Sequence, residues 1–74
     1  MKKLEEHKKG ELIARLFENQ VAHEKCYTFK IYKGKPNKDN VVGMSYIYYI
    51  KQEKCREDMM ESLAQIAMVV NEFK

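Results

Sequence analysis

The sequence predicts one small α+β domain, in which a three-stranded antiparallel meander is followed by an amphipathic C-terminal helix. Two alternating segments rich in aromatic and β-branched residues, 26–32 and 41–51, indicate strands. After Arg56, apolar residues recur at three- and four-residue spacings, which indicates a helix. The 74 residues suffice for one domain and no more.

The first nine residues are almost wholly charged. After Met1, Leu4 is their only apolar side chain, so this segment offers no apolar face to bury. We therefore predict that residues 1–9 form a flexible charged arm and that residues 10–74 form the domain.

The segment 11–21 fits two patterns, and we consider 11–19 of it as a strand. Leu12, Ile13, Leu16 and Phe17 would share one face of a helix, whereas the alternation of the same segment fits a strand with both faces partly apolar. An isolated two-stranded hairpin is marginally stable, and a helix with a broad apolar face needs a wider sheet to pack against. We therefore predict a third strand here, and the alternative order α-β-β-α, with two helices on a hairpin, remains open.

The two clear strands each have a more apolar set of alternate residues, which we expect the helix to cover. A turn-forming stretch, 34–40, connects them, and residues 19–25 form the first turn region. The sets that we assign to the helix side are Tyr27, Phe29 and Ile31 in the first strand, and Val42, Met44, Tyr46, Tyr48 and Ile50 in the second. This assignment leaves Lys30, Tyr32, Tyr49 and Lys51 on the opposite face.

The C-terminal helix is predicted over 56–74. Glu57 and Asp58 lie near its start and Lys74 at its end, where their charges suit the helix dipole. Its core-facing stripe consists of Met59, Met60, Leu63, Ile66, Ala67, Val70 and Phe73. Met68 and Val69 extend the apolar surface beyond that stripe, so we predict a homodimer.

Composition limits the classes of function. Cys26 and Cys55 are the only cysteines, too few for a disulfide framework, and no apolar stretch is long enough to span a bilayer or to serve as a signal region. We therefore expect a soluble cytoplasmic protein without a membrane partner. The net charge is +3, and 25–38 contains five lysines and no acid, which favours a polyanionic partner.

The predicted face opposite the helix mixes cations with aromatic rings. Single-stranded nucleic acid suits this mixture, because cations follow the phosphates while rings stack on the bases. The same residue types are also common on the solvent face of any antiparallel sheet, so both interpretations stay open. The candidate nucleic-acid-binding residues are Arg15, Lys30, Tyr32, Lys33, Lys35, Tyr49 and Lys51.

No cofactor, metal or catalytic site is predicted. His23 and Cys26 have a ligand-like spacing, but no second closely spaced ligand pair accompanies them. A Cys–His nucleophile pair would need an orienting acid and an enclosed pocket, and nothing in the sequence indicates either. We therefore expect that the protein is not an enzyme.

The order of segments 10–19 and 26–33, a turn, a strand and an amphipathic helix resembles small proteins of phages and integrated mobile elements. Those have an "ATIWEN"-like first strand, an "FYSV"-like second strand and a "DLxKLA"-like helix. The topology is also similar to single-stranded-DNA-binding coactivators of the positive-cofactor-four type, although these have four strands where three are predicted here.

Two hypotheses follow from the residues and the resemblance. The resemblance to the coactivators implies a dimer that binds single-stranded DNA through its sheet. The alternative is a phage- or mobile-element-encoded interaction protein that inhibits or modulates a host protein.

Overall fold

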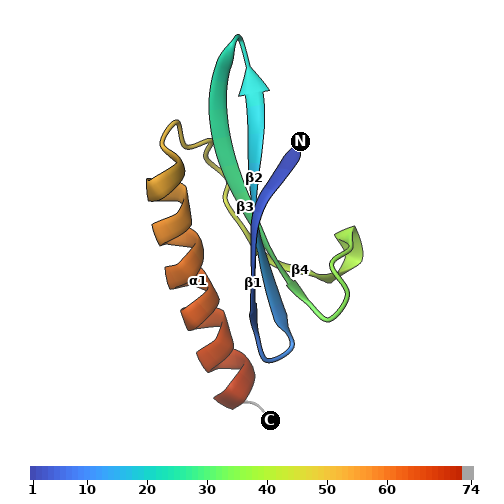
Figure 1. The fold of residues 1–74 in the computed structure, drawn as a ribbon. Coiled ribbons are helices and arrows are strands. Elements are labelled where there is room, and N and C mark those ends of the chain that lie inside the picture. Colours follow the sequence, from blue (N-terminus) through green and yellow to red (C-terminus); the bar gives the residue numbers. More distant parts are fainter. Residues whose placement is uncertain (73–74) are drawn as a thin grey trace.

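The computed structural model describes residues 1–72, which form four strands followed by one long helix (Figure 1). The elements are β1 (Lys2–Lys9), β2 (Leu12–Val21), β3 (Glu24–Lys33), the short 3-10 helix η1 (Lys38–Asn40), β4 (Val41–Met44) and α1 (Gln52–Glu72). The α+β class is confirmed, but the sheet has four strands rather than three. The predicted roles of Phe73 and Lys74 lie outside the described residues.

The sheet is an antiparallel meander of order β1-β2-β3-β4. Helix α1 runs along one face, and the β2–β3 hairpin extends past the start of that helix (Figure 1). One end of the hairpin and the whole opposite face of the sheet are therefore not covered by the helix. We call this opposite face the open face.

The prediction of a flexible arm at residues 1–9 was wrong, because this segment forms β1. It pairs with β2 from Lys2 opposite Glu18 to Lys9 opposite Leu12, with a bulge between Lys3 and Glu5. Leu4, inside the bulge, packs against the core. β1 is an edge strand, and Leu4 is its residue that packs against the core. Such a strand needs little apolar surface, so a mostly charged segment can form it.

The segment 11–19 is a strand, as predicted, and the order α-β-β-α is wrong. β2 lies between β1 and β3, where backbone pairing on both sides outweighs the helix propensity of its residues. Its alternate residues face the helix and form the core with residues of β3 and α1. The core consists of Leu12, Ala14, Leu16, Phe29, Ile31, Cys55, Met59, Leu63 and Ala67.

The first turn is tighter than the predicted loop 19–25. β2 continues to Val21, and two residues, Ala22 and His23, connect it to β3. Both have positive φ, 51° and 68°, as the hairpin turns that match strand twist require. The strain of two such non-glycine residues is tolerated because ten residue pairs join β2 to β3.

The predicted strand 41–51 is only partly regular. β4 ends at Met44, and the following segment stays against β3 at two points. Ser45 N–H donates to the Phe29 carbonyl at 3.1 Å, and Tyr49 exchanges two backbone hydrogen bonds with Tyr27, at 2.7 and 3.1 Å. Residues 46–48 lie between these two points of attachment.

The residues of this segment that lie on the helix side, Gly43 and Tyr49, belong to the alternate set that we predicted for the opposite face. Val42, Met44, Tyr46, Tyr48 and Ile50 are all exposed, whereas Tyr49 packs against the core. A Cβ atom built on Gly43 would lie 2.7 Å from Ile66 Cδ1 of the helix. The helix therefore approaches this segment on the side that has the least side-chain volume. In β3 the prediction is confirmed, since Phe29 and Ile31 are buried and Tyr27 packs against the core.

Helix α1 begins at Gln52, four residues before the predicted start. The additional turn buries Cys55 completely, and this burial raises the pKa of its thiol to about 11. Met60, Met68 and Val69 are exposed along the helix. Within the described residues, no helix combines the length and apolar character needed to cross a membrane.

Candidate nucleic-acid interface

The strand register arranges the open face in rows that cross the sheet. Lys8, Ile13 and Tyr32 form one row, and Glu6, Arg15, Lys30 and Met44 form the next. A third row contains Lys3, Phe17 and Thr28. The rows bring the cations of three strands onto a single surface. These cations are Lys3, Lys8, Arg15 and Lys30, and we call them the basic cluster.

Arg15 is fixed in the middle of this cluster. Its Nε donates to Glu6 Oε1 at 2.7 Å, and its guanidinium carbon lies 5.9 Å from the centroid of the Tyr32 ring. Lys3 Nζ lies 3.6 Å from the same Glu6 oxygen. The hydrogen bond from Arg15 lowers the pKa of Glu6, so this carboxylate stays ionised and competes with any anion for the cations.

Tyr32 lies on the open face, as predicted, but only 6% of its surface is exposed. The guanidinium of Arg15 lies over its ring. A base could stack on this ring only after Arg15 had moved, so Tyr32 serves to orient Arg15.

Lys30 borders a groove on the open face. The groove has a volume of about 330 Å³ and lies between the β2–β3 hairpin and the segment after β4. Its polar groups include Asn19 Nδ2, which donates to Thr28 Oγ1 at 3.2 Å. The lining residues are Met1, Asn19, Thr28, Phe29, Lys30, Met44, Ser45, Tyr46, Ile47 and Tyr48.

The structure separates the remaining predicted residues from this face. Lys33 and Lys35 are exposed at the end of β3 and in the turn that follows it, and Lys51 is exposed just before α1. Tyr49 lies on the helix side, where the hydrogen bond to Asp58 raises the pKa of its hydroxyl. Of the seven candidates, only Arg15, Lys30 and Tyr32 come together.

Sequence reasoning missed several residues of this candidate interface. Lys3 and Lys8 were assigned to a flexible arm, although Gly10 indicated a hairpin. Gly10 has a φ of +60° and opens a two-residue connection between β1 and β2, the position where such turns favour glycine. Tyr46 and Tyr48 were assigned to the helix side, and no signal in the sequence opposed that assignment.

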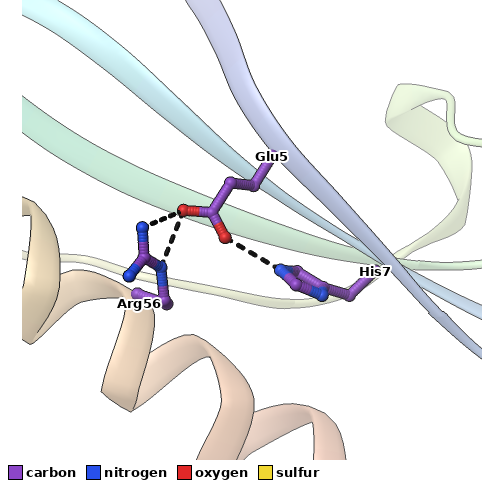
Figure 2. A network of polar contacts seen from close by, with 3 residues as sticks. All are labelled: Glu5, His7 and Arg56. Atoms are coloured by element: carbon purple, nitrogen blue, oxygen red, sulfur yellow. Dashed lines mark hydrogen bonds and ion pairs between the residues drawn. The ribbon is translucent and has the colours of Figure 1, made fainter.

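A polar network on the helix side joins the bulge of β1 to α1 (Figure 2). Arg56 Nε donates to Glu5 Oε2 at 2.7 Å, and His7 Nε2 lies 2.9 Å from Glu5 Oε1. The hydrogen bond from Arg56 is the main cause that lowers the pKa of Glu5. This network holds β1 against the first turns of the helix.

Replacing Glu5 with glutamine should make the stability of the fold decline less steeply as the pH falls. The folded-state pKa of Glu5 lies below its ordinary value of 4.5, so the ionised carboxylate stabilises the fold above that pH. This contribution is lost as pH falls through the folded-state pKa. Thermal denaturation between about pH 5 and about pH 3 should therefore show a shallower decline for Glu5→Gln than for the wild type. Arg56→Gln should give the same shallower decline, and parallel slopes in all three proteins would contradict the role of this pair.

The opposite side of the molecule is more acidic. Helix α1 carries more acidic than basic side chains between residues 53 and 61: the acids are Glu53, Glu57, Asp58 and Glu61, and the bases are Lys54 and Arg56. In the part of the chain that the structure describes, no three His, Cys, Asp or Glu side chains are grouped as metal ligands. Charge is thus divided between a basic sheet face and a more acidic helix.

Together these features define a class of small α+β protein, in which a helix covers one face of a four-stranded meander and the other face is open and basic. A scan against protein-family models, a search of curated proteins and a search of solved structures found no match to the chain. The functional inference therefore rests on the residues themselves.

Proposed function

We propose that the protein binds single-stranded nucleic acid, preferentially DNA, along the open face and acts as a homodimer. The observation that carries this proposal is the basic cluster, which places cations of three adjacent strands on the sheet face that the helix leaves uncovered. Exposed aromatic side chains, Tyr46 and Tyr48, lie beside it.

The arrangement suits a flexible polyanion. Neighbouring strands lie about 5 Å apart, so the cations form a surface patch along which a single strand can place successive phosphates. The acidic residues of α1 repel the same polyanion from the other side.

The dimer is supported by the exposed part of α1. Met60 and Met68 are two helical turns apart and exposed, with Val69 beside Met68. A chain of this size gains stability from such a contact. Sedimentation at tens of micromolar tests it, since a sole species of 8.8 kDa would contradict a stable dimer.

One observation favours the alternative, a phage- or mobile-element-encoded protein that docks on a host protein. Residues 41–50 contain no charged side chain, and several of their large apolar residues are exposed. Exposed apolar segments of this kind often mark protein contacts. Stable binding of a host protein without binding to nucleic acid would favour this alternative.

Binding is tested by fluorescence anisotropy with labelled single-stranded DNA at two or more salt concentrations. The wild type should bind more weakly as salt rises, because binding releases counterions from phosphates. Lys30→Ala should weaken binding to all sequences alike and reduce the salt slope by about one unit. An absence of salt-sensitive binding by the wild type would refute the proposal.

Two control variants separate the open face from net charge. Lys54→Ala removes the same charge from α1, where Lys54 Nζ lies 3.5 Å from Asp58, and should leave the affinity near that of the wild type. Glu6→Gln removes the carboxylate that competes for Arg15 and Lys3, and should strengthen binding. Equal effects of Lys30→Ala and Lys54→Ala would show that only net charge matters.

A further inference from the structure

The segment between β4 and α1 forms an anchored bulge of three residues, 46–48. On β3 the two anchoring residues, Phe29 and Tyr27, are two positions apart, whereas their partners Ser45 and Tyr49 are four positions apart. The extra residues must therefore leave the line of the strand. Ser45 Oγ reinforces one anchor by accepting from Phe29 N–H at 3.3 Å.

The side chains of this bulge are unusually open to solvent. Tyr46, Ile47 and Tyr48 are 88%, 67% and 61% exposed, although the backbone on either side is fixed to β3. Consecutive large apolar side chains on a fixed bulge are more typical of a binding surface than of a loop.

Tyr48 and Tyr46 face different surroundings. Tyr48 lines the open-face groove and also the surface hollows toward the tip of the β2–β3 hairpin. Tyr46 lines the groove too, but it also borders a hollow on the helix side beside Asp58 and Glu61. Tyr46 borders the hollow beside the helix and Tyr48 does not, so we assign Tyr48 to the groove.

We propose that the groove receives one unpaired base of the bound strand, which stacks on Tyr48 while a neighbouring phosphate lies at Lys30. Its volume of about 330 Å³ is at the lower end of the range for small-ligand pockets, roughly 300–1,000 Å³. Asn19 and Thr28 still carry an amide carbonyl oxygen and a hydroxyl hydrogen that can meet the edge of a base. This inference rests on the proposed function and names where bases, as distinct from phosphates, are bound.

The charges favour a base over a second copy of the chain. A planar neutral ring joined to an anionic backbone matches an aromatic wall beside Lys30 and the rest of the basic cluster. A symmetric contact through this groove would instead bring two basic faces together, and like charges in contact oppose association.

The test compares a single strand that carries bases with an abasic strand of the same length. Both have the same phosphates, so only the first can use the groove. The wild type should prefer the base-bearing strand, and Tyr48→Ala should reduce that preference by about 5- to 150-fold, the range for stacking of one base. The Tyr48→Ala variant should bind the abasic strand with the affinity of the wild type, whereas Lys30→Ala should weaken binding to both strands.

Tyr48→Phe is the matched control, since it keeps the ring and should keep the preference. Equal affinity of the wild type for both strands would overturn the base site and leave the proposed function intact. Absence of salt-sensitive binding to either strand would instead refute the proposed function. If Tyr48→Ala converts a dimer to a monomer in sedimentation, the bulge is a contact between copies and the base site is wrong.

Discussion

Deletion of residues 1–9 should abolish cooperative unfolding. The deletion removes β1, with its seven register pairs to β2, the packing of Leu4 and the network that joins Glu5 to Arg56. A domain of this size has about 3–5 kcal/mol of stability from its core, which the loss of a whole strand should exceed. Thermal denaturation followed by circular dichroism should show a broad, non-cooperative change.

The control keeps the strand and changes its charge. Lys2→Ser with Lys9→Ser leaves the backbone pairing of β1 in place, so the thermal transition should remain cooperative and close to that of the wild type. A truncated chain that unfolds like the full-length protein would show that residues 1–9 are the flexible arm that the sequence alone suggests.

The sequence was sufficient for the helix, for β3 and for the strand that begins at Val41, because these carry strong periodic patterns. β2 could be predicted only from packing, because its residues by themselves favour a helix. The helix needs a wider sheet than two strands provide, and this requirement indicated a third strand. β1 could not be found from apolar periodicity, because its only apolar side chain after Met1 is Leu4. The usable signal was the turn at Gly10, where the chain reverses within two residues.

The residues of the candidate site also fall into those that the sequence placed on the correct face and those that it did not. Arg15 and Lys30 were placed on the correct face because they lie in strands that pair without interruption and face each other in the register. In the segment 41–51, the set of alternate residues with the larger apolar side chains suggested the wrong side. The helix packs over Gly43, where it can come close, and this steric condition outweighs the greater apolar area of Val42 and Met44.

Tyr49→Ala is therefore expected to act on stability. The ring packs against the core, the backbone pairs with Tyr27, and the hydroxyl bonds to Asp58. Truncation of a fully buried aromatic residue costs about 3–5 kcal/mol, so we expect about 2–3 kcal/mol for this half-buried one. Urea denaturation measures the change in the free energy of unfolding.

Tyr48→Ala, one position earlier, provides the contrast. Its side chain is 61% exposed, so the free energy of unfolding should change by no more than about 0.5 kcal/mol. Tyr49→Phe should fall between the two, because it keeps the packed ring and loses only the bond to Asp58. If Tyr49→Ala unfolds like the wild type but binds nucleic acid more weakly, Tyr49 belongs to the binding face, and the helix covers the other alternate set of this segment.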